Sequence, residues 1–376
     1  MTRLETGTPA QRDRTIDALR AFAIVGVVLG HWLVSAVVSD PARPVAWHGA
    51  SPLRDAPALI PVTWVLQTLG LFFFAGGYAA ARGGRRGGSR STPAARFARL
   101  LRPVAVLAAV WLPAYLLLRV TGAPDNTLHV VSSLLVHPMW FLVVYLVLTV
   151  CAPVLRAAVA RYGLWSLLPF VTLVAVCDVC RHLEVASWLH PVATVGGWAA
   201  PYLLGIALAA GVLPRRAGLV LAAAGVAAGA ALVLVAGYPA SAVGVPGDGW
   251  SNLNPPSLFA LALASAQLGV FLLVRDRLAV RLRRPAVWAP VALLNRVAMT
   301  VFCWHQSALL LVAFAGLLAG RLPGLLDEPV GAWPLYRLLW LPVFALTLAG
   351  LCSMFRRWER PAASAAAEPP AVPAKP

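Results

Sequence analysis

The fold is decided by the stretch Thr15-Ile-Asp17-Ala-Leu-Arg20-Ala-Phe-Ala-Ile-Val-Gly-Val-Val-Leu-Gly-His31-Trp32, an apolar run that contains one arginine and one histidine. An arginine at the centre of a membrane helix is unfavourable by roughly 2.5 to 3.5 kcal/mol, so an ionisable group there indicates a functional site. Eleven positions along a helix return to nearly the same azimuth, so Arg20 and His31 share one face, about 16 Å apart. One helix face therefore presents a cation near one membrane surface and an acid–base group deep inside.

The composition indicates a polytopic membrane protein. The chain has 376 residues, of which 60% are hydrophobic and only 12% charged, whereas an average soluble domain is about 25% charged. Its 31 Lys and Arg against 14 Asp and Glu give a net charge of +17. Basic residues collect on the cytoplasmic side of membrane segments, which explains this excess better than a nucleic-acid partner does. We therefore expect the lipid bilayer, and no nucleic acid, as a partner.

Ten apolar runs are long enough to span a bilayer. They cover residues 16–38, 58–81, 100–120, 139–159, 164–181, 192–211, 217–237, 256–274, 297–319 and 335–355. With a cytoplasmic N-terminus, 25 of the 31 basic residues lie in inner loops and flanks, and Arg337 is among the six left outside. This asymmetry predicts an all-α bundle of about ten transmembrane helices in the cytoplasmic membrane, with both termini in the cytoplasm.

The chain divides into three parts. Residues 1–15 are a cytoplasmic N-terminal segment, and residues 16–360 form a single membrane domain. Residues 361–376 form an Ala- and Pro-rich tail whose composition is too poor in apolar groups to fold, so we expect it to be disordered.

A basic loop precedes the third apolar run. Arg96, Arg99 and Arg102 follow it at three-residue steps, so they share one side of a helix that enters the membrane. One interpretation is a topology signal in contact with anionic lipid. The other interpretation is a binding site for a phosphorylated cytosolic ligand, because arginine matches phosphate oxygens in bidentate geometry.

His31 is the strongest candidate for a catalytic residue. A neutral imidazole accepts a proton from a hydroxyl near physiological pH, as a general base in acyl transfer must. The alternative is a hydrogen-bonded packing residue. Asp17 lies three residues before Arg20 and is within its reach, where it either offsets the unfavourable burial of that arginine or also aims the guanidinium.

We expect no bound metal. Cys177-Asp-Val-Cys180 with His182 has ligand-like spacing, but it lacks a second ligand pair elsewhere and sits at a helix end.

Six short motifs, in order along the chain, resemble those of the acyltransferase 3 family of integral membrane O-acyltransferases. They are Arg14-Thr-Ile-Asp17-Ala-Leu-Arg20-Ala-Phe-Ala-Ile with His31, Leu71-Phe-Phe-Phe-Ala-Gly-Gly77-Tyr78, Arg96 to Pro103, Pro138-Met-Trp140-Phe141-Leu142, Phe302-Cys-Trp-His305 and Trp358-Glu359-Arg360-Pro361. Gly76 stands where the family commonly has serine, and Cys303-Trp304 stand where it usually has tyrosine or leucine.

The resemblance implies a ten-helix enzyme that transfers an acyl group, acetyl or another short acyl, from acyl-CoA to a hydroxyl of a carbohydrate, glycan or glycosylated metabolite, often in the cell envelope. Acyl-CoA would be a cosubstrate, with no permanently bound cofactor. The resemblance implies Arg20 and His31 as the essential pair. We expect Arg20, with Asp17 beside it, to position the donor, and His31 to act as general base or to relay the acyl group. The other expected site residues are Arg14, Arg96, Arg99 and Arg102 for the donor and Tyr78, Trp140, Phe141 and His305 for the acceptor pocket. His305 has an equally simple interpretation as a packed residue.

Two other functions fit the same residues. A transporter or exporter of an acylated metabolite or glycan would use Arg20 and His31 as a substrate and proton site. A non-catalytic membrane partner would present its basic loops to anionic lipid or to a second enzyme.

Overall fold

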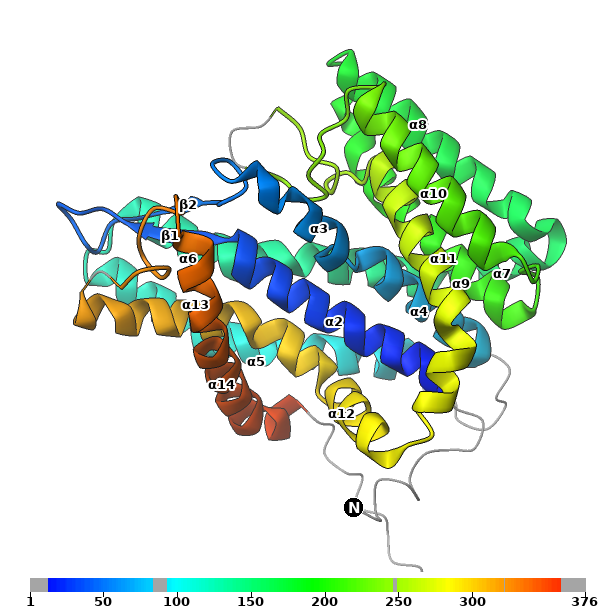
Figure 1. Cartoon of the computed structure of the whole chain (residues 1–376). Helices are drawn as coiled ribbons and strands as arrows, with labels where there is room; N and C mark the ends of the chain where they lie inside the picture. Colours follow the sequence, from blue (N-terminus) through cyan, green and yellow to red (C-terminus); the bar gives the residue numbers. More distant parts are fainter. Residues whose placement is uncertain (1–12, 84–92, 246–248, 321, 360–376) are drawn as a thin grey trace, which may run out of the picture.

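The computed structural model describes residues 13–83, 93–245, 249–320 and 322–359, and most of these residues are helical (Figure 1). The helices are α2 (Arg14–Val34), α3 (Ile60–Leu66), α4 (Leu69–Gly83), α5 (Pro93–Val120), α6 (Asp125–Val136), α7 (Trp140–Tyr162), α8 (Leu168–His182), α9 (His190–Ala210), α10 (Ala217–Leu234), α11 (Leu258–Arg281), α12 (Pro285–Arg296), α13 (Ala298–Ala319) and α14 (Trp333–Glu359). The strands β1 (Ala36–Ser39) and β2 (Trp47–Ala50) form an antiparallel hairpin in which Ala36 pairs with Ala50.

The predicted all-α polytopic membrane fold is confirmed. The described residues contain nine helical stretches that are long and apolar enough to cross a membrane. One of them, residues 125–182, holds both α7 and α8, which were predicted as two spans, so each of the ten predicted spans has a helical counterpart. Large apolar side chains on the outer faces, such as Val226 and Leu346, are exposed, as lipid-facing residues are in a bilayer.

The second predicted span, residues 58–81, lies within the stretch Pro57–Gly83, which is long and apolar enough to cross a membrane, but it is not one continuous helix. The chain leaves helical geometry at Gln67, between α3 and α4. The hydroxyl of Thr68 donates to the carbonyl of Ala23 at 2.7 Å, and the side-chain oxygen of Gln67 accepts from the Leu69 amide at 3.1 Å. At Gly26, a side chain would collide with Thr68. The break is therefore held by polar contacts with α2, which hydropathy does not reveal.

Helix α2 crosses the middle of the view in Figure 1 and contacts α3, α4, α11, α12, α13 and α14. Asp13 caps its first turn, where the carboxylate accepts from the Thr15 amide at 3.0 Å. The helix ends at Ser35, whose extended backbone leads directly into β1. It is therefore shorter than the predicted span 16–38, because its last residues are used in the hairpin. We call the end of the bundle at which α2 begins the base, and the end at which α2 finishes the cavity end.

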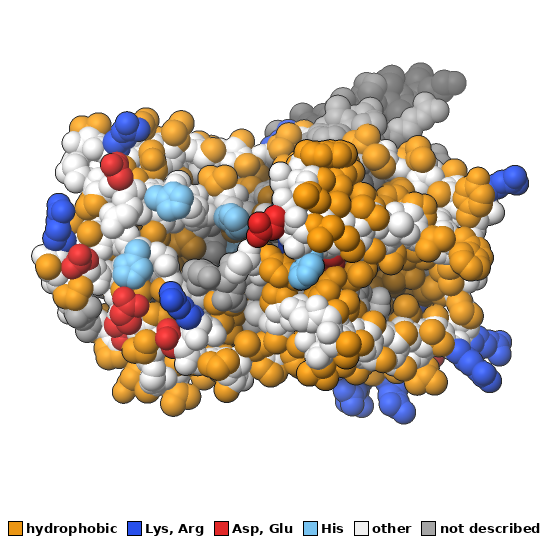
Figure 2. All heavy atoms as spheres, turned by 90° about the horizontal axis from the view of Figure 1, so that it is seen from above, with side chains coloured by type: hydrophobic (Ala, Val, Ile, Leu, Met, Phe, Trp, Pro, Cys, Tyr) orange, Lys and Arg blue, Asp and Glu red, His pale blue; other side chains and the backbone are white. Residues whose placement is uncertain are grey.

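The cavity end is built by short elements that hydropathy does not predict. Helix α6 has only 12 residues and mixed polarity, and its Thr127 hydroxyl accepts a hydrogen bond from the amide of Trp47 in the hairpin at 2.9 Å. Figure 2 looks down on the molecule, with histidine side chains around a hollow on the left and hydrophobic side chains over much of the remaining surface. On the face in view, histidine side chains therefore gather around this hollow.

Candidate active site

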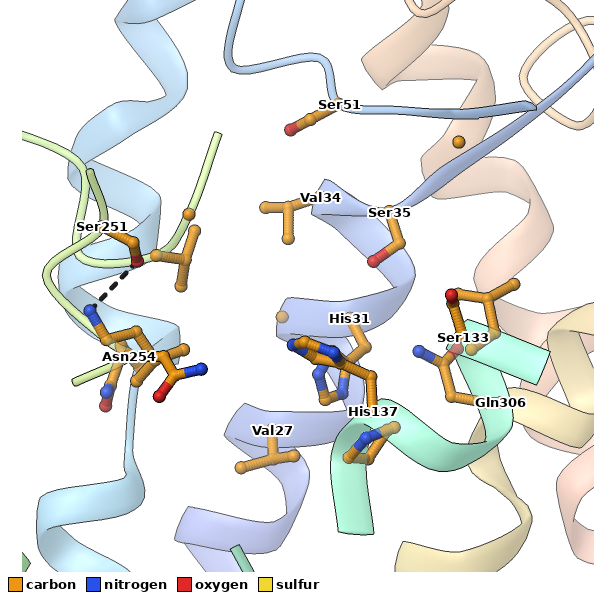
Figure 3. A pocket seen from close by; sticks show the side chains of 18 of the residues that line it. Val27, His31, Val34, Ser35, Ser51, Ser133, His137, Ser251, Asn254 and Gln306 are labelled. Carbon is orange, nitrogen blue, oxygen red and sulfur yellow. Dashed lines mark hydrogen bonds between the residues drawn. The ribbon is translucent and has the colours of Figure 1, made fainter. Parts of the chain in front are cut away.

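A cavity of about 740 Å³ opens beside the last turn of α2. Its wall combines residues from α2, the α3–α4 break, the hairpin, α6, the loop 235–257 and α13. Figure 3 shows His31 between the loop that carries Ser251 and Asn254 and the helix that carries Ser133. No Asp, Glu, Lys or Arg is among the described residues that line it, so the cavity offers histidines, amides and hydroxyls in an apolar wall.

The structure brings together two histidines that lie 274 residues apart. His31 Nδ1 is 2.9 Å from His305 Nε2, with the rings stacked at 4.9 Å between centroids. His305 Nδ1 lies 2.6 Å from the carbonyl oxygen of Phe302. Because a carbonyl can only accept, His305 carries its proton on Nδ1 and offers the Nε2 lone pair. His31 must then donate from Nδ1, which leaves its own Nε2 as an unprotonated base.

Three predicted pocket residues, Trp140, Phe141 and His305, lie at this site: the first two line the cavity and the third contacts His31. Tyr78 does not line it. Its hydroxyl instead donates to Asp13 Oδ2 at 3.0 Å, at the base.

The base of the bundle is held by an ion pair. Asp13 Oδ2 accepts from Arg275 Nη2 at 2.6 Å. Although burial opposes it, the hydrogen bonds from Thr15, Arg275 and Tyr78 and the charge of Arg275 lower the pKa of Asp13. Tyr78 therefore contacts α2 at its first turn rather than at the cavity.

The predicted partners of His31 are also at the base. Arg20 is partly buried and is not among the cavity residues, and Asp17 is buried, its backbone carbonyl accepting from Asn295 at 2.8 Å. Arg14 donates to the carbonyl of Leu282 at 2.9 Å and lies over the ring of Trp288. The structure does not bring Arg20 to His31; they occupy opposite ends of α2.

The predicted donor arginines lie on α5. The side chains of Arg96 and Arg99 fall outside the described residues, and Arg102 is exposed. Within the described part of the chain, no group of three or more His, Cys, Asp or Glu side chains is placed to hold a metal ion.

Sequence reasoning missed Gln306, which lines the cavity next to His305. The side chain is 3% exposed, its amide oxygen has no hydrogen-bond partner within the described residues, and its amide is turned toward the cavity (Figure 3). A signal was present, because Thr300, His305, Gln306 and Ser307 are four polar residues within one apolar helix.

Sequence reasoning also missed Arg337, which is 1% exposed and donates to backbone carbonyls at the end of α2. Arg337 lies in an apolar run. The rule that an ionisable group in a membrane helix indicates a functional site therefore applied to it as well as to Arg20. Arg337 was instead counted among the basic residues on the outer side.

Comparison with known proteins identifies the family. The family model described as an acyltransferase domain matches residues 13–356, nearly the whole chain. No curated protein and no solved structure matches the chain. The matched residues contain both histidines and all the described walls of the cavity. The chain therefore belongs to the acyltransferase 3 family and is a multi-pass membrane acyltransferase.

Proposed function

We propose that this enzyme transfers a short acyl group from acyl-CoA to a hydroxyl of a carbohydrate, glycan or glycosylated metabolite, with His31 as the general base. The observation that carries the proposal is the hydrogen-bonded pair of His31 and His305, which leaves an unprotonated imidazole nitrogen beside the cavity. A general base must be neutral and within hydrogen-bond reach of the proton it removes.

The reaction is an acyl exchange between sulfur and oxygen. The acceptor hydroxyl gives its proton to His31 Nε2, and its oxygen attacks the thioester carbonyl. The tetrahedral intermediate then collapses, the carbon–sulfur bond breaks, and His31 returns the proton to the departing CoA sulfur. His305 accepts the Nδ1 hydrogen bond throughout, which fixes the tautomer and favours the imidazolium as it forms, in the way that an acidic residue orients a catalytic histidine elsewhere.

Gln306 supplies an amide beside this chemistry. Negative charge develops on the thioester oxygen as the bond forms, and an N–H donor in a site shielded from water stabilises such charge strongly. We assign this role to the amide N–H of Gln306, because the side chain is buried, lines the cavity and follows His305 directly.

The donor would approach from the base. Arg20 lies about 16 Å from His31 along α2, and arginines are suited to the phosphates of CoA. Arg14, Arg96, Arg99 and Arg102 would add positive charge at that end, with Asp17 as a neighbour of Arg20. The uncharged polar lining of the cavity suits a polyhydroxy acceptor, with Trp140 and Phe141 as apolar surface for its ring.

The test measures CoA release from acetyl-CoA by the purified full-length protein in lipid nanodiscs, with and without a panel of neutral methyl glycosides. His31→Ala is expected to reduce glycoside-dependent release by about 10²- to 10⁴-fold, the range for loss of a general base. His182→Ala is the matched control, because His182 is exposed at the end of α8. Full turnover by His31→Ala with intact thermal unfolding would refute the assignment.

A further inference from the structure

Arg337 on α14 is a buried arginine that contacts α2 beside the histidine pair. Its guanidinium donates to three carbonyls: Nε to Trp32 at 2.7 Å, Nη2 to Ser35 at 2.9 Å and Nη1 to Gly324 at 3.1 Å. The rings of Trp333 and Phe344 face it at 5.1 and 4.8 Å. Within the described residues no carboxylate lies close enough to form an ion pair with it.

Burying a charged guanidinium in this way is unfavourable, which indicates that its position is important to the protein. A buried ion loses its hydration, and three neutral carbonyls and the charge of Asp327, which is not in ion-pair contact with it, replace that hydration only in part. Two of these carbonyls belong to the last turn of α2 and its C-cap, where the helix dipole presents partial negative charge. The guanidinium therefore fixes the end of the helix on which His31 sits.

Trp32 links Arg337 to His305, the second histidine of the pair. Its carbonyl accepts from Arg337, and its indole Nε1 donates to the carbonyl of His305 at 3.0 Å. The indole is 2% exposed and packs on Phe344 of α14 at 5.4 Å. Trp32 thus joins α2 to both α13 and α14, one residue away from His31.

The close approach of the loop before α14 to Arg337 also requires a glycine. Gly324 has φ of +77°, and a side chain there would collide with the backbone of Tyr336 and Arg337. Its amide donates to Asp327 at 2.9 Å while its carbonyl accepts from Arg337. The loop before α14 is therefore shaped to bring the guanidinium against α2.

We propose that Arg337 and Trp32 are positioning residues, which hold α2 and α13 in register so that His31 keeps one tautomer with its Nε2 unprotonated. The kinetic part of this inference rests on the proposed role of His31, whereas the tautomer part does not. An imidazole–imidazole hydrogen bond of 2.9 Å tolerates little displacement, because a shift of the helices removes the acceptor that dictates the tautomer.

The first test reads the tautomer directly. Full-length protein labelled with ¹⁵N-histidine in lipid bilayers gives signals from its seven histidines, and subtraction of His31→Ala and His305→Ala spectra assigns the pair. Wild type is expected to show one unprotonated Nε2 signal for His31. Trp32→Phe and Arg337→Lys are expected to show mixed tautomers, because phenylalanine has no N–H and a lysine cannot span two carbonyls as a guanidinium does.

Trp340→Phe is the matched control. Its indole also donates to a carbonyl, that of Pro323 at 2.9 Å, but the contact is exposed and joins α14 to the preceding loop rather than to α2 or α13. This variant is expected to keep the wild-type tautomer. A single unprotonated Nε2 signal retained in both Trp32→Phe and Arg337→Lys overturns the proposal, whatever their activity.

The second test is a double-mutant cycle on glycoside-dependent CoA release. Trp32→Phe is expected to lower kcat by about tenfold to 10²-fold, the scale of a small misplacement of a catalytic group. In a His305→Ala background the same change is expected to lower kcat by less than about twofold, because residues acting through one another are non-additive. Equal effects in both backgrounds would mean that Trp32 acts on stability alone, and would contradict a positioning role.

Discussion

At the residue scale, the chemistry depends on which nitrogen of each imidazole carries the proton. The carbonyl of Phe302 decides this for His305, and His305 then decides it for His31. No carboxylate is needed for this orientation, which suits a site whose described lining has no charged side chain. A hydrogen-bonded pair of neutral imidazoles avoids burying an anion in the apolar interior, where an unpaired charge is strongly unfavourable.

Gln306 gives a prediction at this scale. Gln306→Leu keeps the volume but removes the N–H, so we expect kcat for CoA release to fall by about 10²-fold, the smaller end of the range for loss of an oxyanion donor. Gln306→Glu is expected to be worse than leucine, because a carboxylate repels the developing negative charge. Wild-type turnover by either variant, measured at saturating acetyl-CoA, would exclude this role.

At the element scale, the described residues of the loop between α10 and α11, 235–245 and 249–257, form part of the cavity wall and are held in place by α8. Asp178 on α8 accepts from Arg181 at 2.8 Å, from the Tyr238 hydroxyl at 3.0 Å and from the Leu258 amide at 2.7 Å. Arg181 in turn donates to the carbonyl of Ser251 at 2.9 Å. Burial and the charge of Asp178 raise the pKa of Tyr238, so the phenol keeps its proton and remains a donor.

This arrangement predicts that Asp178 affects acceptor binding rather than chemistry. In Asp178→Asn, an amide NH₂ replaces a carboxylate oxygen and faces hydrogen-bond donors, so the loop loosens. Part of the free energy of glycoside binding is then spent on ordering the loop. We expect the KM for the glycoside to rise by about tenfold, since charged hydrogen bonds contribute roughly 1.5 to 3 kcal/mol, with kcat little changed. Asp276→Asn, at an exposed position on α11, is the control. A fall in kcat with constant KM would contradict the assignment.

At the scale of the whole molecule, α2 joins the two ends of the bundle. Its first turn is tied to α11 and α4 through Asp13, Arg275 and Tyr78, and its last turn to α13 and α14 through Trp32 and Arg337. The helix between these ties packs against α4, where Thr68 meets it. Polar contacts therefore hold the helix at both ends, and in its middle the hydrogen bond from Thr68 to Ala23 adds to the apolar packing.

The base gives a prediction about stability and pH. Because the pKa of Asp13 is lower in the folded protein, its contribution to stability is present above the unfolded pKa, about 3.9, and is lost as the pH falls through the folded value. Asp13→Asn keeps a capping oxygen but loses the ion pair with Arg275. We expect a lower thermal midpoint than wild type at pH 7, with the difference shrinking below about pH 4. A difference that is constant down to pH 3 would contradict it.

The sequence by itself determined the fold class and the approximate spans, and it made His31 a candidate site residue, because hydropathy and the rarity of ionisable groups in membranes are local properties of the chain. Four features lay beyond it: the break at Gln67, helix α6, the place of Gln306 in the cavity wall and the burial of Arg337. Each depends on how segments far apart in the chain pack together, which the hydropathy of one segment does not report.

Helical periodicity placed Arg20 and His31 on one face of α2, but a shared face says nothing about which distant residue packs against it. The structure separated Arg20 from His31 and paired His31 with His305, which lies 274 positions away. Only tertiary packing decides such a contact, because the hydrogen bond that fixes the tautomer of His31 exists only when α2, α13 and α14 are held in register.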